Sequence, residues 1–168
     1  VNGYGTKQDI ELGLRWLRKA RYEGSPMACF EYGQMRMDGR FVRKNRKDGE
    51  QWIRRAAEQN FPVALLYLSD GYFYGDVFKQ SISQAISWRL RYYAAIPPEQ
   101  AAEDVLNFMD ACFAKASEKQ MTELAKVVEK AADAGVPEAM VAVGDYYMLG
   151  FHGFKEDHDE AFRYYREA

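Results

Sequence analysis

Apolar positions along the chain follow helical spacing, and the whole pattern returns every 36 residues. Between residues 25 and 60, Ala28, Tyr32 and Met35 recur at three- and four-residue intervals, which indicates one buried face of a helix. The strongest markers of the period are three tryptophans in step, Trp16, Trp52 and Trp88, and three glycines, Gly3, Gly39 and Gly75. A period of about 20–50 residues is typical of solenoids, in which each unit buries its apolar face against its neighbours. The sequence therefore predicts stacked helical repeats.

The unit from residue 25 to 60 predicts two helices, at about 26–37 and 46–59, divided by a turn at Asp38-Gly39. Residues 97–135 lack the internal glycines and predict two longer helices, at about 99–114 and 118–134. We therefore expect an all-α, right-handed α/α superhelix (a solenoid) of about four antiparallel helix-pair repeats. We expect a single domain over 1–168, truncated at both ends, with units of about 1–24 (partial, opening at Gly3-Tyr4-Gly5), 25–60, 61–96, 97–135 (degenerate) and 136–168.

Each second helix begins at a residue that can cap it. The residues in this register are Asp9, Asn45, Ser81 and Asp157. These are strong N-cap types, because their side-chain oxygens accept free backbone N–H groups. Gly49 lies four residues further on, inside a helix, where glycine costs about 1 kcal/mol relative to alanine. Its presence predicts a close approach of the first helix at Gly33. Large aromatics in step, Trp16, Trp52, Trp88 and Tyr164, are then expected to fill the space between units.

The net charge of −2 hides an asymmetry between the two parts of the chain. Residues 1–98 carry 16 Lys and Arg against 10 Asp and Glu, whereas residues 99–168 carry 7 against 15. This distribution fits two differently charged solvated faces, with head-to-tail self-association as the alternative. The two cysteines, Cys29 and Cys112, fall in units that are not adjacent, so we expect buried free thiols. Apolar runs are too short to span a bilayer.

Catalytic motifs are missing from the sequence. It has no phosphate-binding glycine loop, no H-E-x-x-H, no C-x-x-C and no G-x-S-x-G. His152 and His158, with Asp157 and Asp159, suggest a metal site, but a polar loop followed by the acidic first turn of a helix explains them better. We therefore expect no enzyme activity, no cofactor and no metal.

The repeat pattern resembles that of the Sel-one-like repeats, a branch of the tetratricopeptide-type helical repeats. The matching positions are Ala28, Tyr32, Gly33, Gly39, Gly49, Trp52, Ala56 and Ala57, and again Ala139, Val143, Gly144, Tyr147, Gly150, Gly153, Asp157, Ala161 and Tyr164. Arg36 and Ser69 depart from it, standing where the family has tyrosine and glycine. The resemblance implies a helical-repeat adaptor, often bacterial, with no catalytic residues to transfer.

By analogy with this family, the first helix of each pair lines the concave groove, so its positions not needed for packing are candidates for partner binding. They are Glu31, Gln34, Asp38, Tyr67, Asp70, Tyr74, Asp145 and Tyr146, with Leu149 continuing the stripe. Acidic groups beside tyrosines suit a protein or peptide ligand that carries Lys or Arg. A packing role for the tyrosines is the alternative.

Two other functions compete with a peptide-binding scaffold. The basic run Arg40, Arg43, Lys44, Arg46 and Lys47 supports binding of single-stranded RNA, although the chain is acidic overall and an ordinary solvated loop explains the run. A small-molecule or hydrolase site hidden in the groove, using Glu31, Asp70 or Asp145, is the second. The sequence does not distinguish a periplasmic, secreted or cytoplasmic location, and it leaves the oligomeric state open.

Overall fold

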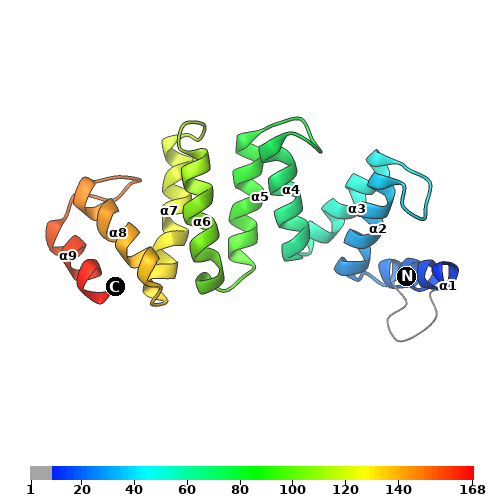
Figure 1. Cartoon of the computed structure of the whole chain (residues 1–168), viewed down its shortest axis with the longest axis horizontal. Helices are drawn as coiled ribbons and strands as arrows, with labels where there is room; N and C mark the ends of the chain where they lie inside the picture. The colour runs from blue at the N-terminus through cyan, green and yellow to red at the C-terminus, as the bar shows by residue number, and fades with distance from the viewer. Residues whose placement is uncertain (1–8) are drawn as a thin grey trace. The chain divides into compact units, whose positions relative to one another are not determined.

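The computed structural model describes residues 9–168, and over this range the chain is all-helical (Figure 1). The helices are α1 (Ile10–Tyr22), α2 (Pro26–Asp38), α3 (Arg46–Glu58), α4 (Pro62–Tyr74), α5 (Ile82–Ala94), α6 (Pro98–Cys112), α7 (Glu118–Asp133), α8 (Pro137–Leu149) and α9 (His158–Glu167). The turn expected at residues 3–5 lies outside the described residues. The chain forms two compact units, one ending at Leu68 and the other beginning at Ser69, so the division falls within α4.

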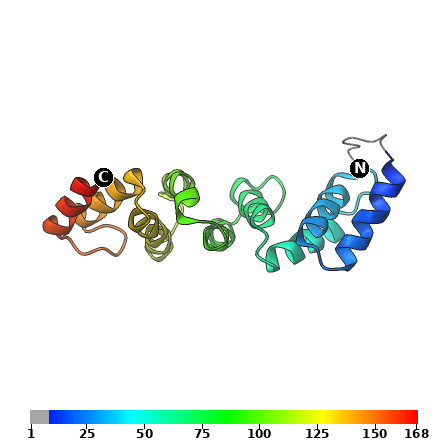
Figure 2. The same cartoon turned by 90° about the horizontal axis from the view of Figure 1, so that it is seen from below.

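Helices that follow one another pack as antiparallel pairs, as the period predicts. In the first unit α2 packs against both α1 and α3. In the second, α6 pairs with α7 and α8 with α9, as Figure 2 shows. We call the first helix of each pair (α2, α4, α6, α8) an A helix and the second (α1, α3, α5, α7, α9) a B helix. In the second unit, A helix α6 also contacts A helix α8, and B helix α5 contacts B helix α7. The predicted all-α repeat fold is therefore confirmed.

The helix ends follow the chemistry of the residues at them. Asp9, Asn45, Ser81 and Asp157 each accept a hydrogen bond from a backbone N–H in the first turn of the helix that follows, as predicted. Gly39 ends α2 with φ 81°, a left-handed conformation that glycine adopts without steric cost. The helices expected at 26–37, 46–59, 99–114 and 118–134 all form, with bounds within two residues of those predicted.

The close approach of α2 and α3 depends on two glycines that face each other. A Cβ atom on Gly49 would lie 2.7 Å from the Gly33 carbonyl oxygen and 2.9 Å from the Met37 backbone nitrogen. A Cβ on Gly33 would lie 2.9 Å from the Gly49 carbonyl oxygen and 2.6 Å from Cγ1 of Ile53. Backbone atoms block both positions, so the predicted reason for these helical glycines is confirmed.

Gly49→Ala is expected to lower the free energy of unfolding by about 2–3 kcal/mol, because the two backbones must separate to admit the methyl group. Gly144→Ala is the matched control. The three atoms nearest to its Cβ would all belong to the ring of Tyr165, a half-exposed side chain that can turn away. Urea denaturation followed by circular dichroism compares the two. Equal losses would contradict a backbone-limited contact at Gly49.

The aromatic residues in register differ in their burial. Trp52 packs edge-on to Tyr32, with ring centroids 6.1 Å apart, and Arg21 of the preceding B helix lies over its ring at 4.3 Å. Trp52 and Trp88 are half-buried and Tyr164 is buried. The expectation that Trp16 is buried as well is wrong, because 58% of its surface is exposed.

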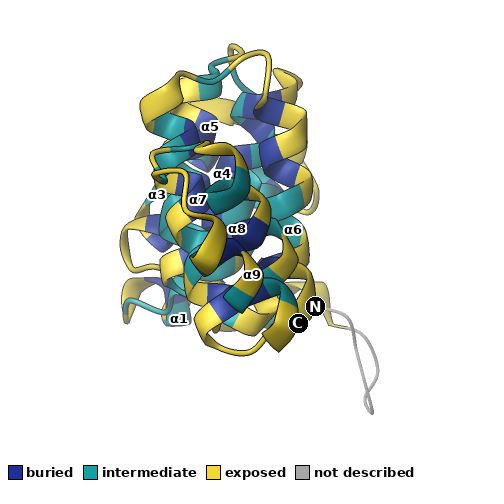
Figure 3. Cartoon of the chain, turned by 90° about the vertical axis from the view of Figure 1, so that its left-hand side faces the viewer, coloured by how far each residue is buried: buried dark blue, intermediate teal, exposed yellow. Residues whose placement is uncertain are grey.

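The segment without internal glycines, residues 97–135, is fully part of the second unit. Its buried side chains, among them Val105, Leu124 and Val128, join one apolar cluster with residues of α5 and α8. Buried and exposed positions alternate along these helices, as expected when one face meets a neighbour (Figure 3). Cys29 and Cys112 are buried free thiols, as predicted, and burial raises the pKa of both.

Candidate functional site

One face of every A helix carries residues at the same 4-3-4 spacing, which places them in a line along the helix. In α6 they are Glu99, Glu103, Leu106 and Asp110, followed by Phe113 just past the helix end; in α8 they are Glu138, Ala142, Asp145 and Leu149. The equivalents in α2 are Met27, Glu31, Gln34 and Asp38, and in α4 Val63, Tyr67, Asp70 and Tyr74. Because α6 and α8 contact each other, their two lines lie on adjacent helices.

Two hollows lie along this pair of helices and share Leu106. The first has a volume of about 470 Å³ and is lined by Glu99, Ala102, Glu103, Leu106, Asn107, Val136 and Glu138. The second has a volume of about 390 Å³ and is lined by Leu106, Met109, Asp110, Phe113, Met121, Ala142, Asp145, Tyr146 and His152. We call the two together the α6–α8 groove. Volumes of this order suit a side chain or a small ligand.

The α6–α8 groove is acidic around an apolar floor. Its carboxylates are Glu99, Glu103, Asp110, Glu138 and Asp145, and among the described residues no Lys or Arg lines either hollow. Within residues 9–168 none of the five forms an ion pair, although Asp145 accepts a hydrogen bond of 2.7 Å from the Tyr165 hydroxyl. That bond raises the pKa of Tyr165 to about 12. Phe113 is 72% exposed at one end of the groove. The arrangement favours a cationic ligand that also has an apolar part.

Tyr146 both packs and lines the groove. Its ring meets His152 edge-on at 5.0 Å and Phe154 at 5.6 Å, and its hydroxyl donates to Sδ of Met109 at 3.7 Å. Burial, with Asp110 and Asp145 nearby, raises its pKa to about 12. Burial lowers the pKa of His152, which favours the neutral imidazole. Tyr146 thus fixes one wall of the second hollow while its neighbour Asp145 supplies charge.

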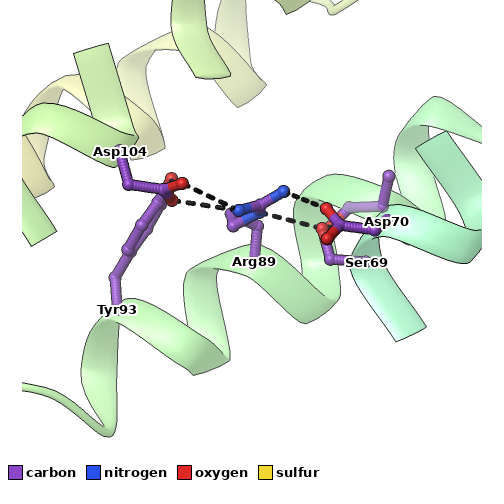
Figure 4. A network of polar contacts seen from close by, with 6 residues as sticks. Ser69, Asp70, Arg89, Tyr93 and Asp104 are labelled. Atoms are coloured by element: carbon purple, nitrogen blue, oxygen red, sulfur yellow. Dashed lines mark hydrogen bonds and ion pairs between the residues drawn. The ribbon is translucent and has the colours of Figure 1, made fainter. Parts of the chain in front are cut away.

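Asp70 lies in a separate polar cluster centred on Arg89, which is only 5% exposed (Figure 4). The Arg89 guanidinium donates to Asp70 at 2.5 Å and to both carboxylate oxygens of Asp104 at 3.0 and 3.2 Å. Its Nε donates to the Ser69 hydroxyl at 3.0 Å, and the Tyr93 hydroxyl donates to Asp104 at 2.8 Å. Asp70 is thus bound within its own unit.

Burial is the main influence on the ionisation of Asp70. It raises the pKa of this carboxyl, Arg89 lowers it, and the nearby Asp104 raises it again. Burial and the bond to Asp104 likewise raise the pKa of Tyr93. The cluster therefore depends on the one guanidinium that compensates two carboxylates.

The other predicted residues have different surroundings. Glu31 and Gln34 are half-buried on α2 and Asp38 is exposed. Tyr67 packs edge-on to Phe30, with ring centroids 5.7 Å apart, which is a packing contact. Tyr74 is 70% exposed and meets Phe73. Of the eight predicted residues, the structure brings Asp145 and Tyr146 together in one hollow.

The sequence model of the Sel1 repeat matches residues 1–25, 26–61, 62–88 and 137–168, which is more than half of the chain. The chain belongs to the Sel1 repeat family. Two solved structures are similar to it. A Sel1 repeat protein from Oxalobacter formigenes is 23% identical with a TM-score of 0.56, over 96% of this chain and 46% of that one. The protective antigen c5321 of uropathogenic Escherichia coli, which has an SLR fold, is 25% identical with a TM-score of 0.55, over 97% of this chain and 34% of that one.

This Sel1 repeat chain thus spans less than half the length of either solved structure. Among curated proteins no significant match was found. Sel1 repeat proteins are generally non-enzymatic scaffolds for protein interaction. The α6 carboxylates lie in residues 89–136, the stretch that the family model does not match.

Sequence reasoning missed the α6 residues of the groove. A shift of 36 residues from Tyr67, Asp70 and Tyr74 leads to Glu103, Leu106 and Asp110, so the period itself carried the signal. The same shift pairs Ser69 with Gly33 and Arg89 with Ile53. Ser69 and Arg89, which bond to each other, thus occupy the positions that Gly33 and Ile53, which approach each other closely, have in the preceding unit.

The described residues provide little for metal binding. Over residues 9–168 no three His, Cys, Asp or Glu side chains lie close enough to hold an ion. Asp157 caps α9, and His158 lies 3.1 Å from Glu156. Among the helices of this range, none is long and apolar enough to cross a bilayer.

Proposed function

We propose that this Sel1 repeat chain is a non-enzymatic scaffold that binds a basic protein segment in the α6–α8 groove. The observation that supports the proposal is the set of five carboxylates arranged around an apolar floor, with no cation lining either hollow. The predicted residues Asp145 and Tyr146 form part of this groove. The ligand proposed is an extended peptide with Lys or Arg on either side of an aromatic or aliphatic residue.

Binding is expected to combine two weak contributions, ion pairs and apolar contact. Exposed ion pairs contribute only about 0.2–1 kcal/mol each, so several are needed together. Apolar contact with Leu106, Met109 and Phe113 adds burial that salt does not screen. Charge complementarity also speeds encounter, so affinity is expected to fall as ionic strength rises. Enzyme activity is not part of the proposal, because the groove holds no nucleophile with an activating base.

Glu103→Lys with Asp110→Lys is expected to weaken binding of a labelled peptide rich in Lys and Arg by about tenfold or more, because attraction becomes repulsion at two sites. Fluorescence anisotropy measures the affinity. Both residues are exposed, so the melting temperature should change little.

The matched control is Glu123→Lys with Asp133→Lys, which makes the same change of charge on α7 at residues that line neither hollow. We expect its affinity to stay within about twofold of the original. Equal weakening by both variants would show that only net charge matters. Unchanged binding by the groove variant would refute the groove as the site.

Binding of single-stranded RNA through the basic run at residues 40–47 is the competing function. RNA binding would fall steeply with salt. It would also be unaffected by Glu103→Lys with Asp110→Lys, or strengthened by the added cations. The groove variant therefore separates the two functions, because it weakens peptide binding and does not weaken RNA binding.

A further inference from the structure

The loops that join an A helix to the following B helix each carry an aromatic residue. In the loop after α2 this residue lies at a different position from those in the loops after α4 and α8. In the loop after α4, Phe78 stacks on Tyr72 at 4.8 Å and covers Gly71. In the loop after α8, Phe154 packs on Tyr147 at 4.9 Å. The loop after α2 has Val42 at the equivalent position, with Arg36 in place of the tyrosine. Its aromatic is one residue earlier, at Phe41, and is 43% exposed.

The helix beneath this loop leaves no room for an aromatic ring to fold back. Met35 is the equivalent of Gly71, and it is buried there. Arg36 instead donates to the Arg43 carbonyl oxygen and to the Asp48 carboxylate, both at 2.6 Å. The Asn45 backbone N–H donates to the Arg36 carbonyl oxygen at 2.8 Å. These bonds anchor the second half of the loop to α2 and α3, which lowers the entropic cost of ordering it on binding.

Cations flank the exposed Phe41 along the chain. Arg40, Arg43, Lys44 and Lys47 are all exposed, and the Arg40 guanidinium lies over the Phe41 ring at 5.8 Å. An apolar ring between cations matches the chemistry of the α6–α8 groove, where carboxylates surround Leu106, Met109 and Ala142. The chain thus carries both a basic loop and an acidic groove that complement each other.

We propose that the loop of residues 40–47 in one copy of this chain docks in the α6–α8 groove of a second copy. This inference rests on the proposed function and names the ligand of that groove. Phe41 enters the hollow lined by Met109 and Phe113, and the loop cations meet Asp110 and Asp145. The contact is head-to-tail: each copy uses one surface as donor and the other as acceptor. Such a contact builds open chains of copies unless its geometry closes a ring.

Complementation between two variants tests the inference. Arg43→Glu with Lys44→Glu disables the loop and leaves the groove intact. Glu103→Lys with Asp110→Lys disables the groove and leaves the loop intact. Sedimentation velocity at low salt should show the unchanged chain growing in mass with concentration, while each variant alone stays monomeric. An equimolar mixture of the two should form a one-to-one complex and nothing larger, because only one working contact remains.

Two controls and three contrary results make the test decisive. Arg15→Glu with Arg18→Glu, exposed residues of α1, changes the charge of the first unit equally and should associate like the unchanged chain. Salt should weaken association of the unchanged chain by about tenfold or more between low and high ionic strength.

A mixture of the two variants that stays monomeric overturns the inference. If the mixture is monomeric but the loop variant still binds the basic peptide, the proposed function stands without the self-association. If neither the unchanged chain nor the loop variant binds the peptide, the proposed function and the inference both fail. Loss of single-stranded RNA binding in the loop variant, together with a monomeric mixture, identifies the loop as a nucleic-acid site and also overturns the inference.

Discussion

Trp52→Ala is expected to lower the free energy of unfolding by about 3–4 kcal/mol. The substitution removes a large half-buried ring that packs on Tyr32 and lies under the Arg21 guanidinium. Arg21 is buried, within residues 9–168 its Nε has no hydrogen-bond partner, and its guanidinium lies over the rings of Trp52, Tyr32 and Tyr22. The substitution therefore removes a cation–π contact with Arg21 and leaves a cavity. Urea denaturation followed by circular dichroism measures the loss.

Trp16→Ala is the matched control, because Trp16 has the same place in the repeat but is 58% exposed. Its expected cost is below about 1 kcal/mol, typical of an exposed position. Trp52→Phe should recover part of the loss by retaining a ring beside Arg21. Similar costs for Trp16→Ala and Trp52→Ala would contradict the assignment of Trp52 as the aromatic that joins successive units.

Arg89→Ala is expected to cost about 3–4 kcal/mol at neutral pH. Removing one partner of a buried ion pair leaves carboxylates without their cation, and here Asp70 and Asp104 both lose it. The cost is expected at the lower end for buried pairs, because both carboxylates are 42% exposed. The Ser69 hydroxyl also loses a partner, although it still donates to the Ala85 carbonyl oxygen.

The same variant should respond to pH in a defined direction. Burial already raises the pKa of Asp70, and loss of Arg89 removes the main influence that lowers it. A folded-state pKa above the unfolded value means that stability is lost as pH rises through that range. The penalty of Arg89→Ala should therefore shrink when the pH is lowered toward the ordinary pKa of aspartate, about 4.

Arg163→Ala provides the comparison for Arg89. Arg163 also pairs with two carboxylates, Glu160 and Glu167, but its side chain is 42% exposed. Its loss should cost much less than that of Arg89, because water and salt screen exposed ion pairs. If Arg163→Ala and Arg89→Ala proved equally costly, burial would not be the reason that the Arg89 cluster is needed.

The repeat architecture could be predicted from the sequence because its markers are local and recur. Gly33 and Gly49 indicated where two backbones meet, and the caps at Asn45 and Ser81 indicated where helices begin. Trp16 shows the limit of the method. A period assigns equal roles to equal positions, whereas burial depends on which neighbours each position has.

The groove was harder to predict, for a different reason. The glycines that mark the packing are missing from residues 97–135, so that segment drew no attention as a binding surface. Its outward positions nevertheless keep the 36-residue spacing, with Glu103 and Asp110 in step with Tyr67 and Tyr74. Tyr67 shows the converse: its type suggested binding, and its contact with Phe30 is one of packing. Residue type on a helix face does not determine whether a neighbouring helix covers it.

The exchange of Gly33 and Ile53 for Ser69 and Arg89 has a consequence for rebuilding this protein. If α4 alone replaced α2, the Ser69 side chain would lie where Ile53 and the Gly49 carbonyl oxygen already fill the space. If α5 alone replaced α3, the Arg89 guanidinium would be buried without the carboxylate of Asp70. The two helices of a hairpin must therefore be exchanged together, and a hairpin that carries Arg89 also needs a following helix with a carboxylate at the position of Asp104 in α6.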